Sequence, residues 1–191
     1  MPRIDAPTVA EHHSNQRAAL LAAGGDLLAT RGVDAVTPAA VGAAAGLARS
    51  SVYQYFDSSP ALIAAIVEDA FPRATDELRA AVARAGTPSA QVDAYVRTAL
   101  KMATDPVHRS LYALGRTELP PACRARLAEL HAEQHAPLRA ALGALAAPDP
   151  DLTTTLVLGL LGAAVQCVID GAARRPVERR LLAVLHHGVQ A

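Results

Sequence analysis

Residues 37–56 read TPAAVGAAAGLARSSVYQYF, and this stretch decides the fold. Thr37 followed by Pro38 is typical of a helix start, because the hydroxyl can cap free amides and proline fits the first helical position. The helix that follows is predicted to be short and to end at Gly46, where a tight turn needs a residue that tolerates positive φ. A second short helix is predicted from Ala48 to Tyr55. Two short helices joined by Ala-Ala-Gly outline a helix-turn-helix unit.

A longer helix is predicted to precede this unit. From Ser14 to Arg31 the leucines recur on one helical face, and Gly32 ends the helix. Residues 1–13 contain prolines and polar clusters, so we expect a flexible tail there. The helix-turn-helix domain is therefore predicted over residues 14–60, and a larger helical domain over residues 61–191.

The rest of the chain predicts further helices. Ala and Leu dominate, and no stretch alternates apolar and polar residues as a half-buried strand would. We expect proline to begin several helices and to kink or break two of them at Pro72 and Pro137. The expected starts are Pro60, Thr87-Pro88, Asp105-Pro106, Pro120-Pro121, Pro150 and Val177. The fold class is all-α, with about nine helices.

Composition excludes several classes of protein. The chain has 191 residues, 51% of them hydrophobic, and no net charge, which excludes a chain disordered throughout. Neutral charge also argues against a protein that simply coats nucleic acid or anionic membranes. Two cysteines are too few for a disulfide scaffold, and the first residues lack the apolar core of an export signal. We therefore expect a cytoplasmic protein.

One apolar run raises the possibility of a membrane span. Residues 152–169 contain no charged side chain and reach the length of a transmembrane helix. The run contains three threonines and a glutamine, however, and lacks an aromatic belt and a basic anchor on its N-terminal side. The alternative is a helix buried on nearly all sides, inside a helical domain or between two subunits, and we expect this second arrangement, with no membrane.

The stretch from Leu20 to Leu62 resembles the N-terminal DNA-binding domain of the TetR family of transcriptional regulators. The resemblance covers about a quarter of the chain and is carried by Gly32, Thr37, Val41, Ala45-Gly46-Leu47, Val52-Tyr53-Gln54-Tyr55-Phe56 and Leu62. It implies that the helix from Ala48 enters the major groove of DNA, while Val41, Leu47, Val52 and Phe56 form the core.

The resemblance also implies individual contacts with DNA. Arg49 can fork onto a guanine, and Gln54 can read an adenine or touch the backbone. The hydroxyls of Tyr53, Tyr55 and Thr37 are expected to bind phosphates. The full expected set is Thr37, Pro38, Ala48, Arg49, Ser50, Ser51, Tyr53, Gln54, Tyr55 and Ser59.

Two positions depart from the family pattern. Ala48 stands where the family often has a capping Ser, and Ser59 stands where it usually has a Lys beside a phosphate. Residues 1–56 also carry as many acidic side chains as arginines. We therefore expect modest DNA affinity with a shallow dependence on salt.

The C-terminal region is expected to hold an effector and to form a dimer. By resemblance its helices enclose a pocket for a small molecule, although such polar side chains can equally lie on a solvated surface. The expected effector-binding residues are Tyr95, Thr98, Met102, His108, Tyr112, Arg116, His131 and Gln166. The apolar run and the last helix predict a four-helix homodimer interface, formed by Leu156, Leu160, Val168, Leu181 and Leu185. Such a dimer suits a palindromic operator, whose half-sites lie ~34 Å apart.

Enzyme and metal chemistry find little support. His131 and His135 have the i, i+4 spacing that can hold a metal, but no third ligand accompanies them. No phosphate-binding loop, nucleophile elbow or carboxylate pair stands out, so we expect no enzyme, metal or cofactor. The sequence predicts a DNA-binding regulator, as a repressor released by a small-molecule effector. The alternative is a TetR-like helical dimer that binds a small ligand or a protein partner without specific control of DNA.

Overall fold

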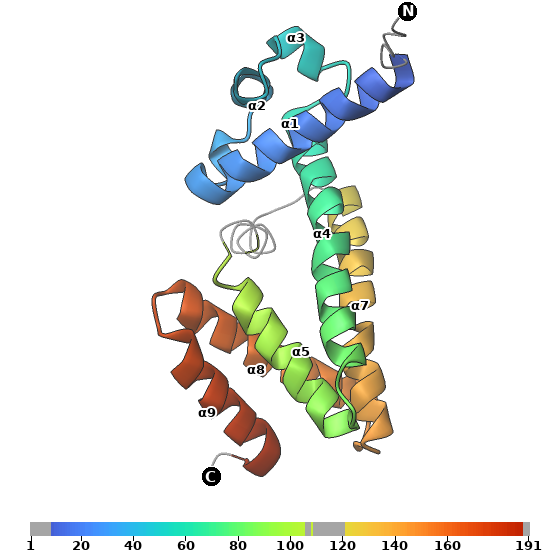
Figure 1. Cartoon of the computed structure of the whole chain (residues 1–191), viewed down its shortest axis with the longest axis vertical. Helices are drawn as coiled ribbons and strands as arrows, with labels where there is room; N and C mark the ends of the chain where they lie inside the picture. The colour runs from blue at the N-terminus through green and yellow to red at the C-terminus, as the bar shows by residue number, and fades with distance from the viewer. Residues whose placement is uncertain (1–8, 106–107, 109–120, 189–191) are drawn as a thin grey trace, which may run out of the picture. The chain divides into compact units, whose positions relative to one another are not determined.

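The structure is a computed structural model, and it describes residues 9–105, 108 and 121–188. This part of the chain contains eight α-helices and one 3-10 turn and no strand, which confirms the all-α prediction (Figure 1). The chain divides into two compact units, residues 1–69 and 70–191, so the predicted boundary at residue 60 lies too early. The helix expected after Asp105-Pro106 falls almost entirely outside the described residues.

The N-terminal unit is built from short helices around a long one. It contains α1 (Val9–Arg31), the turn η1 (Val33–Ala35), α2 (Pro38–Ala44), α3 (Arg49–Val52) and the first part of α4 (Ser59–Ala83). Helix α1 begins at Val9, so the expected tail of residues 1–13 is too long. A tertiary contact accompanies this earlier start, because the ring of His13 packs on Tyr55 with 4.4 Å between the ring centres.

Local signals fix the helix-turn-helix geometry. The Thr37 hydroxyl accepts a hydrogen bond from the backbone N–H of Ala40 at 3.2 Å and so caps α2, as predicted. Gly46 has φ +71°, the turn conformation that its position required. Gly42 permits close packing, because a Cβ there would lie 2.9 Å from the carbonyl oxygen of Leu47.

Helix α3 is shorter than predicted. It covers Arg49–Val52, and residues 53–55 continue as a turn in which the backbone N–H groups of Gln54 and Tyr55 bond three residues back. Ala48 offers no side-chain cap, in keeping with its departure from the family pattern.

The core of the N-terminal unit is apolar and contains most of the predicted core residues. Val41, Val52 and Phe56 are buried as expected, whereas Leu47 is only half-buried. Gly24 lets α1 pack against Ile66 of α4, which a Cβ at that position would overlap.

The C-terminal unit consists of the second part of α4 with α5 (Pro88–Met102), α7 (Pro121–Ala144), α8 (Pro150–Ile169) and α9 (Arg174–His187). The chain does not break at Pro72 or Pro137, because α4 and α7 run through these prolines, and the predicted alternative of a kink stays a prediction. Pro72 is exposed, so water can replace the hydrogen bond that its missing N–H forfeits. Helix α9 likewise begins at Arg174, before its predicted start at Val177.

The apolar run of residues 152–169 forms most of helix α8. By length and composition it is the one described helix able to cross a membrane, with a mean hydropathy of 2.0. Thr154, Val157, Leu161 and Val165 nevertheless belong to the buried part of the C-terminal unit. The helix therefore packs into a helical core on one side and is exposed on the other, so the expected burial on nearly all sides is not found within one protomer.

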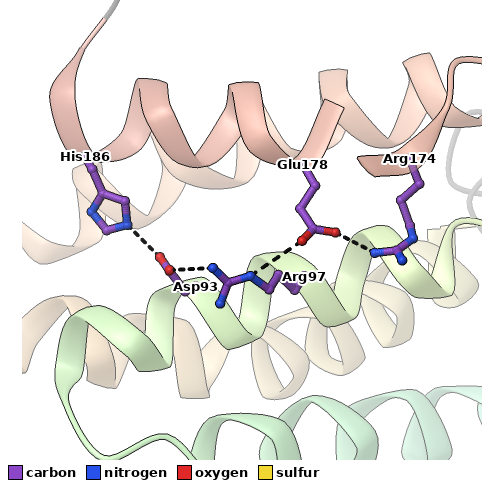
Figure 2. A network of polar contacts seen from close by, with 5 residues as sticks. All are labelled: Asp93, Arg97, Arg174, Glu178 and His186. Carbon is purple, nitrogen blue, oxygen red and sulfur yellow. Dashed lines mark hydrogen bonds and ion pairs between the residues drawn. The ribbon is translucent and has the colours of Figure 1, made fainter. Parts of the chain in front are cut away.

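Charged side chains join α9 to α5 (Figure 2). The Asp93 carboxylate accepts from Arg97 at 2.9 Å and from His186 Nε2 at 2.6 Å. Glu178 pairs with Arg97 at 3.5 Å and with Arg174 of its own helix. Both carboxylates are largely shielded from solvent, so the chain of ion pairs fixes the register of the two helices.

Candidate nucleic-acid interface and effector cavity

Helix α3 and the turn after it carry an exposed, largely polar face. Ala48, Arg49, Ser50, Tyr53 and Gln54 are exposed, as residues that approach DNA must be. The Arg49 guanidinium donates to the Tyr53 hydroxyl at 3.2 Å and lies over the Tyr53 ring, 5.7 Å from its centre. This hydrogen bond raises the pKa of Arg49, and the contact limits the rotamers that the long side chain samples.

Tyr55 occupies a different environment from Tyr53. Its hydroxyl donates to Oε1 of Gln16 at 2.6 Å, and its ring packs between His13 and Phe56. A phenol has one O–H donor, so a phosphate would have to displace Gln16 to receive it. Tyr55 thus holds α1 against the turn after α3, and its expected phosphate contact stays a prediction that requires this bond to open. Nothing in the sequence pattern indicated Gln16 or His13 for this role.

The remaining expected DNA contacts differ in accessibility. Thr37 is exposed, although its hydroxyl oxygen already accepts from Ala40. Ser51 and Ser59 are half-buried, and Ser59 is the first residue of α4. Pro38 is buried, so its side chain belongs to the core and its expected DNA contact is not supported.

The C-terminal unit contains a cavity of about 680 Å³ between its helices. Its walls are mostly apolar, and the polar side chains among its described lining residues are Tyr95, His108, His131, Gln134 and His135. A cavity of this size and composition suits a drug-sized ligand. The apolar lining residues are Phe71, Ala74, Leu78, Met102, Ala103, Ala128, Ala132, Leu158, Leu161, Val165 and Ile169.

Two histidines of α7 form the polar wall of the cavity. The rings of His131 and His135 stack with centres 5.6 Å apart, and the edge of Phe71 meets His131 at 5.0 Å. Burial lowers the pKa of His131, and this effect outweighs a hydrogen bond with the backbone of Leu127 that raises it. Burial also lowers the pKa of His135 to about 4, with a smaller contribution from the neighbouring charge of His131. Both rings are consequently neutral at physiological pH.

The cavity contains part of the predicted effector set. Tyr95, Met102, His108 and His131 line it, whereas Thr98 does not. Gln166 also lies outside the lining, and its amide donates to Asp170 at 2.8 Å. Tyr112 and Arg116 lie outside the described residues.

Sequence reasoning missed much of the apolar lining. Phe71, Leu78 and Leu161 were indistinguishable from ordinary core residues, because a helical pattern shows which face is apolar but not whether a void remains. His135 was noticed only for its metal-ligand spacing with His131. Among the described side chains no group of three forms a metal-binding cluster.

A row of leucines on α8 is exposed. Leu152, Leu156 and Leu160 are spaced four residues apart and are 55%, 60% and 43% exposed. Leu156 and Leu160 are thus accessible to a second protomer, and their role in a dimer interface stays a prediction. Leu181 is 6% exposed and belongs to the core of its own unit, so its expected interface role is wrong. Val168 and Leu185 are partly buried against the same core.

Comparisons with known proteins agree with this geometry. Residues 20–66 match the family model for bacterial regulatory proteins of the tetR family. A search of curated proteins gives no match. Similar solved structures share the fold over nearly the whole chain at low sequence identity.

Three of these structures were solved with small molecules. A protein from Saccharomonospora viridis with choline has a TM-score of 0.82 at 15% identity, covering 91% of this chain and 97% of its own. FadR from Bacillus subtilis with stearoyl-CoA has a TM-score of 0.76 at 14% identity, covering 90% and 98%. LfrR from Mycobacterium smegmatis with proflavine has a TM-score of 0.67 at 20% identity, covering 93% and 98%. Residues 20–66 are therefore assigned to the family of bacterial regulatory proteins of the tetR type, and the rest of the chain shares the fold of the solved structures.

Proposed function

We propose that the chain is a cytoplasmic, homodimeric transcriptional repressor, which binds a palindromic operator and is released from it by a small molecule. The observation that carries this proposal is the exposed face of α3 and the turn that follows it, where Arg49 is held by Tyr53 in a helix-turn-helix domain. A guanidinium presented in this way suits the O6 and N7 acceptors of guanine in the major groove. The role is non-enzymatic.

Phosphate binding rests on few groups in this proposal. Tyr53 is free to meet a phosphate with its O–H, because it accepts rather than donates in its bond with Arg49. Tyr55 is engaged with Gln16, and Ser59 supplies no positive charge. We therefore keep the expectation of a shallow salt dependence, since few counterions are released.

Dimerisation is proposed through the exposed leucines of α8. Two copies of this face related by a two-fold axis bury Leu152, Leu156 and Leu160 against their equivalents. A dimer carries two copies of the Arg49 face, one for each half-site of a palindrome whose halves lie on successive turns of DNA. The operator is accordingly expected to be a palindrome with a guanine in each half.

Release is proposed to follow binding of an effector in the C-terminal cavity. Neighbours in structure were solved with stearoyl-CoA, choline and proflavine, which supports a ligand role for the equivalent part of this chain. Coupling of this kind is reciprocal, so operator DNA should weaken effector binding by the same factor.

Selection of bound sequences from a randomised duplex library tests the proposal without knowledge of the operator. Enriched sequences should be palindromic, and the full-length protein should bind them at least a hundredfold more tightly than scrambled DNA. Arg49→Ala should weaken this binding and relax the preference for guanine, and Tyr53→Phe should weaken it less. Arg84→Ala, which removes an exposed arginine of the C-terminal unit, is the matched control and should have no effect.

Absence of any enriched palindrome would overturn the proposal. The alternative function, a helical dimer that binds a ligand or a protein partner without specific control of DNA, would then be favoured.

A further inference from the structure

We propose that the C-terminal cavity binds a neutral, largely apolar molecule containing a flat ring and one hydroxyl or carbonyl group, which hydrogen-bonds to His135. This ligand class specifies the effector of the proposed function, and the ligand's role in regulation rests on that proposed function. It concerns the class of ligand, which the family resemblance leaves open.

The described lining offers no fully charged side chain to an ion. None of the described residues that line the cavity is Lys, Arg, Asp or Glu. The titratable groups of this described lining are Tyr95, His108, His131 and His135, and the two histidines of α7 are neutral at pH 7. An ionic ligand would lose its hydration against these side chains without gaining an opposite charge from them, which is costly.

The shape and the aromatic wall favour a ring. The rings of His131 and His135 are nearly parallel and Phe71 meets His131 edge-on, so three aromatic rings border the cavity. Leu158, Leu161 and Val165 of α8 also line it. A planar apolar molecule can therefore bury its faces between aromatic and aliphatic side chains.

His135 supplies the polar contact. Its side chain has no hydrogen-bond partner among the described residues, whereas His131 bonds to the backbone of Leu127. In the described part of the chain, every side-chain nitrogen or oxygen that is fully buried has a hydrogen-bond partner. The unpartnered nitrogens of His135 are therefore not fully buried, and a ligand can reach them. A neutral imidazole offers one donor and one acceptor, which matches a carbonyl or a hydroxyl group.

A fluorescence titration of the full-length protein without DNA tests this ligand class. Three dyes of different charge serve as probes: neutral Nile red, which carries a ring carbonyl, cationic proflavine, and anionic anilinonaphthalene sulfonate. We expect Nile red to saturate at one molecule per protomer at pH 7.5, at least tenfold more tightly than either charged dye.

Variants locate the binding and test the hydrogen bond. His135→Phe keeps a ring but removes both nitrogens, and it should weaken Nile red binding about five- to tenfold. His135→Gln restores a polar group and should recover part of the loss. His187→Phe, an exposed histidine at the end of α9, is the matched control and should bind as the wild type does. Ala132→Phe places a ring in the cavity from α7 and should abolish binding even if the His135 variants fail to fold.

The outcomes separate the ligand class from the proposed function. Equal or tighter binding of a charged dye, unchanged binding by folded His135→Phe, or unchanged binding by Ala132→Phe would each overturn the ligand class. Failure to find an operator would overturn the proposed function and leave these dye measurements standing, because they contain no DNA.

Discussion

Replacing Leu156 by glutamate should dissociate the proposed dimer while leaving the protomer folded. Leu156 is 60% exposed, whereas its neighbour Val157 belongs to the core. Complete burial of a leucine side chain is worth about 1.5–3 kcal/mol, so burying the exposed 60% is worth about 1–2 kcal/mol in each protomer. A two-fold interface contains the residue twice, which gives about 2–4 kcal/mol, or about a 30- to 700-fold increase in the dimer dissociation constant. Desolvation of the new carboxylates makes this a lower bound.

Sedimentation velocity over a dilution series measures the dissociation constant directly. Leu145→Glu changes another exposed leucine, which is 45% exposed and lies just beyond the end of α7, and it should leave the constant unchanged. Leu156→Glu should also weaken binding to a palindromic operator more than binding to a single half-site. A wild-type protein that is monomeric at micromolar concentration would refute the reasoning, as would a Leu156→Glu constant within threefold of the wild type.

Three further predictions concern stability and are checked by chemical or thermal unfolding. Gly42→Ala should destabilise the protein by about 1–2 kcal/mol, because its Cβ meets the carbonyl of Leu47, whereas Gly25→Ala has open space and should stabilise it by up to about 1 kcal/mol. Asp93→Asn removes the anion shared by Arg97 and His186, and it should cost about 1 kcal/mol at low salt and less at high salt (Figure 2). The folded pKa of His135 lies below its unfolded value, so its contribution to stability is complete above the unfolded pKa and is lost as the pH falls toward about 4. After allowance for partial exposure we expect about 1 kcal/mol of loss between pH 7 and pH 5, a slope that His135→Phe should reduce and His187→Phe should not.

The sequence was sufficient for the parts of the fold that depend on local interactions. Thr37 before Pro38, and glycine at position 46, act within one or two turns of the backbone, and both were found in their predicted roles. The buried positions Val41, Val52 and Phe56 followed from helical periodicity and from the family resemblance.

Local rules failed where tertiary packing outweighed them. Proline disfavours a helix interior, yet α4 and α7 continue through Pro72 and Pro137 because flanking residues such as Ala74 and Leu138 are buried in the core of their unit. The early start of α1 likewise accompanies contacts of its first turns with Tyr55, a residue far away in the chain.

The sequence by itself determined the helical class, the helix-turn-helix and the residues of its exposed face, because capping, turn chemistry and periodicity act over a few residues. Only the tertiary structure decided which of two similar tyrosines, Tyr53 or Tyr55, keeps a free donor for DNA. It also decided that Leu181 is core while Leu156 is exposed, and that His135 faces a cavity. These distinctions depend on which helix packs against which, and periodicity identifies an apolar face without naming what covers it.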